Sequence, residues 1–234
     1  GGPFTANAQT FTYSPPVFKD QTVSLFGTQP AGVDKGDLAW GDYNNDGDKD
    51  LLISGERAGS GLSLVLQNIN GSSFINSGIN LPDLIESHVQ CRDLFISGKQ
   101  ANGSGLSRIY LNNGSGGFPT VWASPTGVFD GAADWADYDN DGDLDLLLMG
   151  EEGSGARHFE IYRNDGNGLT AQMIGLPGIS SGDVAFVDVD RDGYHDIFAT
   201  GTDGATRTVY FLKNNGNGSF SGFTTSVFAA MDRA

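Results

Sequence analysis

The sequence predicts an all-β fold built from repeated four-stranded antiparallel units, and three observations support this prediction. The 234 residues include 35 glycines, which together with many Asn, Asp and Ser residues indicate tight turns between short strands rather than helices. A nine-residue acidic loop occurs three times in one register, at residues 42–50, 137–145 and 188–196. The segments around these loops repeat as well, so one structural unit recurs along the chain.

Each acidic loop places oxygen atoms where a hard cation needs them. Asp or Asn occupies positions one, three, five and nine, and the residue at position seven can offer its backbone carbonyl. Glycine at position six permits the sharp turn that points these groups inward. The expected calcium ligands are Asp42, Asn44, Asp46, Asp48, Asp50, Asp137, Asp139, Asp141, Asp143, Asp145, Asp188, Asp190, Asp192, Tyr194 and Asp196.

Two other interpretations of these loops fit less well. An EF-hand loop needs a glutamate at position twelve and helices on both sides, but position twelve is Ile53, Leu148 or Ala199. Each loop instead runs directly into an apolar segment, so it joins two β-strands. A hairpin turn without metal needs one or two Asp or Asn residues, not four oxygen ligands in fixed register.

Four units follow from the strands between the loops. First strands share a glycine, a small residue and an aromatic at equal offsets, at residues 36–42, 131–137 and 182–188. Second strands follow the loops at 51–55, 93–98, 146–150 and 197–201, and third strands lie at 63–67, 108–111, 160–163 and 208–212. Fourth strands begin at Phe74, Phe118, Leu169 and Phe220. We expect an N-terminal segment with one outer strand at 1–35 and units at 36–86, 87–130, 131–181 and 182–234.

The second unit has lost its acidic loop. Val89 matches the first-strand position that lies twelve residues before the last aspartate in the other units, yet Asp93 follows it after only four. Eight residues are therefore missing, and only Asp93 of the ligand set remains. We expect no calcium there and a distorted or shortened hairpin around Gln90, Cys91 and Arg92.

Units of about fifty residues with four antiparallel strands and a loop on one hairpin are typical of the blades of a β-propeller. The loop Asp137-Tyr-Asp-Asn-Asp-Gly-Asp-Leu-Asp145, with an apolar strand after it, resembles the FG-GAP or VCBS repeat of the integrin α-subunit head, of bacterial surface proteins and of some fungal lectins. The resemblance covers about residues 18–228. It implies calcium at the hairpin between the first two strands of a blade, hence three calcium ions here, and no ligand role for Cys91 or Arg92.

The sequence leaves the closure of the ring open. Residues 18–23 resemble a fourth strand ahead of the first full unit, while the last unit already has its own near residues 220–228. The chain could belong to a ring of seven or eight blades, pair with a second copy, or close as a small ring of four or five. We favour incompleteness or dimerisation, because an open array exposes strand edges and an apolar blade face.

Composition narrows the classes of partner and the compartment. The formal net charge of −16 argues against nucleic acid and anionic membranes as partners, because both attract Lys and Arg. The single Cys91 excludes an internal disulfide. The Gly1-Gly-Pro3 start is typical of a processing boundary, so an upstream signal could precede it. Calcium loops of this kind fill most readily outside the cell, which predicts an extracellular or cell-surface location.

Aromatic residues allow two interpretations. Trp40, Trp135 and Phe186 occupy equivalent first-strand positions, where packing between neighbouring blades is favoured over sugar stacking. Trp122, outside that register, and Tyr43 and Tyr138 inside the loops could instead face a ligand.

We predict that the chain is not an enzyme. Its three histidines, His88, His158 and His195, fall at unrelated repeat positions, and His195 is expected to point to solvent from loop position eight. No serine has a nucleophile-elbow context. The glycine-rich connections at 58–61, 101–105 and 152–155 are expected to be turns and not phosphate sites, since no helix follows them.

The predicted function is a calcium-stabilised extracellular module for adhesion or for recognition of a protein or matrix ligand. A calcium-dependent lectin that binds carbohydrate between blades is one alternative. A scaffold domain of a secreted polysaccharide-active enzyme is a second. In each case we expect either self-association or membership of a larger chain.

Overall fold

The computed structural model describes residues 32–91, 94–111, 121–123, 125–166 and 168–224, with the single positions 25, 113, 117 and 118. The strands are β1 (Asp34–Gly41), β2 (Asp50–Arg57), β3 (Ser60–Ile69), β4 (Ser73–Asn76), β5 (Ile85–Cys91), β6 (Leu94–Lys99), β7 (Gly105–Tyr110), β8 (Val121–Ala123), β9 (Phe129–Ala136), β10 (Asp145–Glu151), β11 (Arg157–Asn164), β12 (Leu169–Met173), β13 (Ser180–Val187), β14 (Asp196–Thr202), β15 (Arg207–Asn214) and β16 (Phe220–Thr224). Within these described residues we find no helix with the length and apolarity that crossing a membrane requires.

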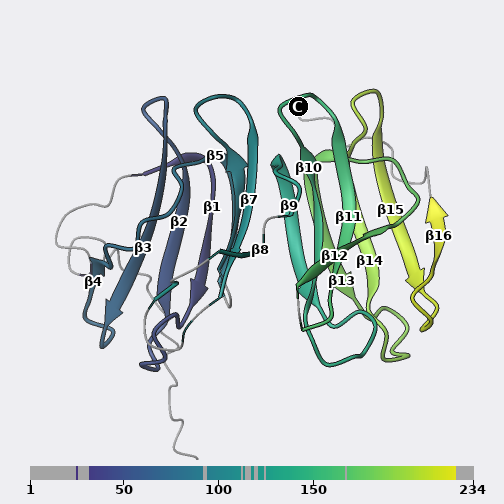
Figure 1. Ribbon diagram of the computed structural model, residues 1–234, viewed down its shortest axis with the longest axis horizontal. Helices are drawn as coiled ribbons and strands as arrows, with labels where there is room; N and C mark the ends of the chain where they lie inside the picture. The colour runs from purple at the N-terminus through teal and green to yellow at the C-terminus, as the bar shows by residue number, and fades with distance from the viewer. Residues whose placement is uncertain are drawn as a thin grey trace, which may run out of the picture.

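The strands form four antiparallel sheets, each made of four consecutive strands. Figure 1 shows the sheets side by side in chain order, from the first in blue to the fourth in yellow-green. The first strands β1, β5, β9 and β13 contact one another in turn. The predicted all-β fold of four four-stranded units is confirmed. Among the described strands none of the first sheet pairs with one of the fourth, so these residues do not show a closed ring.

The second strands are rich in apolar residues, and in the two inner sheets a neighbouring sheet covers both of their faces. In β10, alternate side chains point to opposite faces. Leu146 and Leu148 pack in a cluster shared with the second sheet, whereas Leu147 and Met149 pack in a cluster shared with the fourth. All four are at most 1% exposed. A strand buried on both faces has a continuous apolar run instead of an alternating pattern.

Each first strand carries a β-bulge near its start. The second residue of each first strand lies in this bulge and has a left-handed backbone conformation. Its φ is 45° at Lys35, 49° at Glu86, 49° at Asp130 and 54° at Ser181. The next residue is glycine in three sheets because the backbone of the second strand lies directly against it. A Cβ atom on Gly131 would stand 2.0 Å from the Met149 carbonyl oxygen. The shared glycine of the first strands therefore marks close backbone contact.

The second sheet has the shortened hairpin that the missing residues predict. Val89 pairs with Ile96, as Leu38 pairs with Ile53 in the first sheet. Only two residues separate Cys91 from its partner Leu94. In the first sheet, eight residues separate the last pair of β1 and β2, Gly41 and Asp50. Arg92 and Asp93 lie outside the described residues, as does the strand expected at 18–23. The expected fourth strand of the last unit is β16, and residues 225–228 lie outside the described part.

Two of the three aromatic first-strand residues, Trp135 and Phe186, pack between sheets as predicted, and Trp40 does not. The Trp135 ring lies edge-on to Phe95 of the preceding sheet, with ring centroids 6.5 Å apart. Phe186 stacks on Tyr138 of the preceding sheet at 6.4 Å. No described sheet precedes the first one, and there Trp40 is 54% exposed. The aromatic residue of the first strand is therefore packed against the preceding sheet in the third and fourth sheets and exposed in the first sheet.

The expectation that Tyr43 and Tyr138 could face a ligand is wrong. Both rings are buried, because loop position two points at the following sheet. Tyr43 stacks on Phe118, which lies between β7 and β8, and Tyr138 stacks on Phe186 and Phe220 of the fourth sheet. Trp122 is half-buried against the cluster between the second and third sheets.

Candidate metal centres

The three acidic loops share one backbone conformation. Position four lies in the left-handed region, with φ of 57° at Asn45, 61° at Asn140 and 62° at Arg191. The glycine at position six is also left-handed, with φ of 93° at Gly47, 100° at Gly142 and 88° at Gly193. Glycine adopts this conformation without steric cost, and asparagine tolerates it. These turns fold each loop back on its first aspartate.

The first aspartate organises the loop through two backbone amides. Asp137 Oδ1 accepts a hydrogen bond from the Asp141 amide, and Oδ2 accepts one from Gly142, both at 3.0 Å. The first and third loops repeat this pair at 3.0–3.1 Å. The position-five carboxylate in turn accepts the amide of position seven, as in the 3.0 Å bond from Asp143 to Asp141. Each loop therefore holds its shape through hydrogen bonds from its backbone amides to its own carboxylates.

The last aspartate of each loop is the first residue of the second strand and is buried. Asp50, Asp145 and Asp196 are each at most 1% exposed. One carboxylate oxygen accepts the position-two amide at 3.1 Å in every loop. The other accepts a third-strand amide at 2.8 Å for Asp50 and Asp145 and at 2.9 Å for Asp196.

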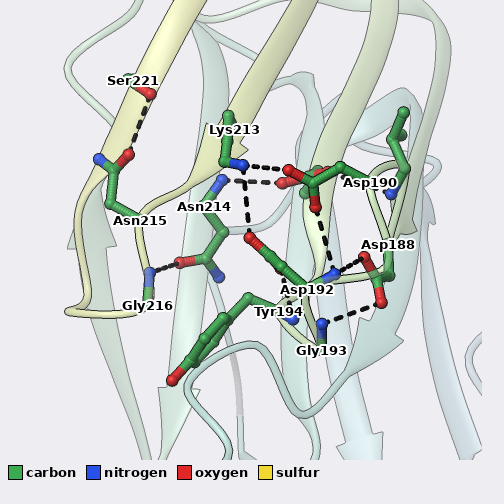
Figure 2. Close-up of polar contacts among 12 residues, drawn as sticks. Asp188, Asp190, Asp192, Gly193, Tyr194, Lys213, Asn214, Asn215, Gly216 and Ser221 are labelled. Atoms are coloured by element: carbon green, nitrogen blue, oxygen red, sulfur yellow. Dashed lines mark hydrogen bonds and ion pairs between the residues drawn. The ribbon is translucent and has the colours of Figure 1, made fainter.

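In each sheet that has a loop, an asparagine of the third strand hydrogen-bonds the last aspartate of that loop. This asparagine was not identified from the sequence. Asn68, Asn164 and Asn214 donate the third-strand amide just described, and their side chains donate to the carbonyl of loop position eight at 3.0–3.2 Å. Figure 2 shows Asn214, whose side-chain oxygen also accepts the Gly216 amide at 3.0 Å. Each asparagine lies two or three residues before a glycine, in a segment with the composition of a turn, which concealed this role. Its recurrence 18 or 19 residues after the last aspartate was the available signal.

Burial, together with the charges of neighbouring carboxylates, raises several pKa values in the loops. Burial, reinforced by the charges of Asp139 and Asp141, raises the pKa of Asp145 to about 7. Burial and the Asp141 charge likewise raise the pKa of Asp139, and burial raises that of Asp50. A carboxylate that is difficult to ionise alone gains from a cation placed beside it.

The donor atoms fit a hard divalent cation. In the second and third loops, the carboxylates at positions one, three and nine bring oxygens within 4.8 Å of one another. In the second loop the buried Asp139 Oδ1 has no hydrogen-bond partner. The first loop has Asn44 at position three, and so offers an amide oxygen there. Carboxylate and carbonyl oxygens with no nitrogen or sulfur donor suit Ca²⁺.

The second and third loops contact each other. Asn140 Nδ2 donates to the Gly193 carbonyl at 3.1 Å, and Asn214 Nδ2 donates to the Tyr138 carbonyl at 2.8 Å. His195 Nδ1 lies 3.2 Å from the Asp137 carbonyl oxygen, so the expectation that this side chain points to solvent is wrong. Position eight of the third loop thus points toward the preceding sheet. The sequence of that loop alone does not indicate this contact.

The other two histidines, His88 and His158, each contact a carboxylate. His88 Nδ1 lies 2.9 Å from Asp37 Oδ2 of the preceding sheet, and its Nε2 lies 3.2 Å from the Ala133 carbonyl of the following one. His158 Nδ1 lies 3.1 Å from Glu160 Oε1 on the same strand. His88 therefore joins its sheet to the sheets on both sides, whereas His158 contacts a residue of its own strand.

Two of the glycine-rich connections line an open cleft between the second and third sheets. Its volume is about 530 Å³, and its lining is polar: Asn102, Gly103, Ser104, Gly105, Gly127, Glu152, Gly153 and Ser154. It lies apart from the acidic loops, since these turns join β6 to β7 and β10 to β11.

Comparison with protein families gives one match. Residues 91–148 match the model of the FG-GAP-like repeat. The matched segment runs from the end of β5 through the second acidic loop to the middle of β10. No curated protein matches the chain.

Proposed function

We propose that this chain, which contains an FG-GAP-like repeat, is a calcium-stabilised extracellular module of the β-propeller type that recognises a protein or matrix ligand. The observation that carries the proposal is the repeated oxygen arrangement of the acidic loops, with one buried carboxylate oxygen, Asp139 Oδ1, left without a partner. The groups that would hold the ion are the side chains at positions one, three, five and nine and the carbonyl at position seven. Calcium would supply the positive charge that these carboxylates lack.

The same chemistry supports an extracellular location as part of this proposal. Sites of this type that sit on exposed loops bind calcium weakly, and the calcium concentration outside a cell fills them. The formal charge of −16 fits a secreted or surface-attached protein and disfavours binding to nucleic acid.

The two end sheets support recognition of another propeller surface. Leu38 and Trp40 on the first sheet are 56% and 54% exposed, and Val189 on the fourth is 56% exposed. Their counterparts in the inner sheets are covered by a neighbouring sheet. These ends are therefore suited to further blades of a larger chain or to a second copy of this one.

Carbohydrate binding is the second candidate. The polar cleft between the second and third sheets, which includes Asn102 and Glu152, is the described feature that favours it. A glycan array probed in calcium and again in chelator separates the two candidates, because selective binding to one sugar class would identify a lectin.

Calcium binding is tested by two alanine variants of one loop. Asp141→Ala removes a position-five ligand and should lower the melting temperature by several degrees in calcium, while the melt in chelator stays nearly unchanged. Asp143→Ala is the matched control, because position seven can still contribute its backbone carbonyl. Thermal unfolding followed by circular dichroism measures both. Equal losses for Asp141→Ala in calcium and in chelator would show that the loop holds no metal.

A further inference from the structure

One third-strand position faces every acidic loop. It is the residue just before the asparagine that holds the last aspartate: Gln67 in β3, Arg163 in β11 and Lys213 in β15. Lys213 Nζ pairs with Asp190 and lies 3.4 Å from Asp192 Oδ2 (Figure 2). Arg163 Nε lies 3.3 Å from Asp139 Oδ2.

The first loop has a neutral version of the same contact. The Gln67 side chain lies beside the Asp46 carboxylate, and the residue at loop position three is Asn44 instead of aspartate. In the second sheet, where the loop is missing, the equivalent residue is Leu111, which is 40% exposed. A polar or cationic side chain thus occurs at this position only where the described chain has a loop to contact.

The residues at loop position three and at this strand position are matched in charge. A loop with asparagine at position three has glutamine at the strand position, whereas the loops with aspartate at position three have arginine or lysine there. Counting the side chains at positions one, three, five and nine together with the third-strand residue, each loop has a formal charge of −3. In the second and third loops, the additional carboxylate at position three is therefore offset by one cationic side chain, Arg163 or Lys213.

We propose that Lys213 and Arg163 are built-in counter-ions that set the cation affinity of their loops by competing with the metal for the carboxylate at position three. The proposal rests on the calcium binding proposed above. Lys213 pairs with the carboxylates at positions three and five, so it stabilises the empty third loop and repels an incoming divalent ion. Arg163 is shared with Asp165, with which it also pairs, so its effect on the second loop is smaller.

The direction of each substitution follows from this competition. Lys213→Gln removes a positive charge from the rim of the third loop, and calcium should bind there on the order of tenfold more tightly. Gln67→Lys adds a charge beside the first loop and should weaken binding there by a similar factor. Adding Asn44→Asp to Gln67→Lys recreates the arrangement of the third loop and should return the first loop to near its original affinity.

The glycine amides allow each loop to be measured by itself. Gly47, Gly142 and Gly193 donate to the first aspartate of their loops at 3.0–3.1 Å, so their resonances should move when that aspartate binds an ion. A calcium titration followed by two-dimensional amide NMR then gives one affinity per loop. Arg207→Gln is the matched control, since it removes one charge from the opposite end of β15.

The expected result is tighter binding at Gly193 in Lys213→Gln, with Gly47 unchanged and with Arg207→Gln close to the parent protein. Unchanged affinity at Gly193, or an equal change in Arg207→Gln, would overturn the role of Lys213 while leaving calcium binding intact. Glycine amides that do not move in the parent protein would instead reject calcium binding itself. Gln67→Lys gives an independent test if Lys213→Gln does not fold.

Discussion

Phe95→Ala is expected to lower the free energy of unfolding by about 3–5 kcal/mol, the typical cost of removing a fully buried aromatic ring. The Phe95 side chain has no exposed surface and lies in the cluster between the second and third sheets. It also contacts the Trp135 ring edge-on. Urea denaturation followed by tryptophan fluorescence measures the loss.

Phe198 provides a matched control for this substitution. It occupies the same register position in the fourth sheet, but it is 39% exposed because no described sheet follows. Phe198→Ala should therefore cost about 1–2 kcal/mol. Equal losses for Phe95→Ala and Phe198→Ala would contradict an open end face and would mean that another surface covers the fourth sheet in solution.

Asn214→Ala is expected to cost about 3 kcal/mol in calcium and in chelator alike. Its side chain is buried, donates to the Tyr138 and His195 carbonyls and accepts the Gly216 amide. Alanine would leave these backbone groups without partners, and each unsatisfied buried group costs about 1–3 kcal/mol. The loss does not depend on metal, because none of these bonds involves a carboxylate.

The equivalent asparagine of the first sheet shows how much of this cost comes from the contact between sheets. Asn68 donates to the Lys49 carbonyl at 3.0 Å and accepts the Gly71 amide at 2.9 Å, and both bonds are exposed. Asn68→Ala should therefore cost about 1 kcal/mol. If chemical denaturation found the two alanine variants equally stable, the bond from Asn214 to Tyr138 would not connect the third and fourth sheets as described.

Much of the fold could be predicted because its signals are local and repeated. The oxygen-bearing residues at fixed loop positions, with glycine at position six, identified each hairpin without reference to the rest of the chain. The same register showed that the second unit lacks eight residues, and the pairing of Val89 with Ile96 agrees with that alignment.

Contacts between sheets were predicted less well, because they join residues far apart in the sequence, such as 58 positions for His195 and Asp137 and 76 for Asn214 and Tyr138. Tyr138 stands among aspartates and therefore seemed exposed, yet its ring packs on the next sheet. His195 seemed to face solvent, yet it reaches the Asp137 carbonyl. Asn214 had the local pattern of a turn, and only the three-dimensional arrangement shows that it joins two loops.

Calcium content is the measurement that tests the central claim most directly. The protein is dialysed to equilibrium against calcium, and the calcium in the protein compartment in excess of that in the buffer is measured by atomic emission, with a chelator-treated sample as the control. Three acidic loops predict three calcium ions per chain, all removed by the chelator. A fourth ion would contradict the absence of a site in the second sheet, and a folded protein without calcium would contradict the assignment of all three loops.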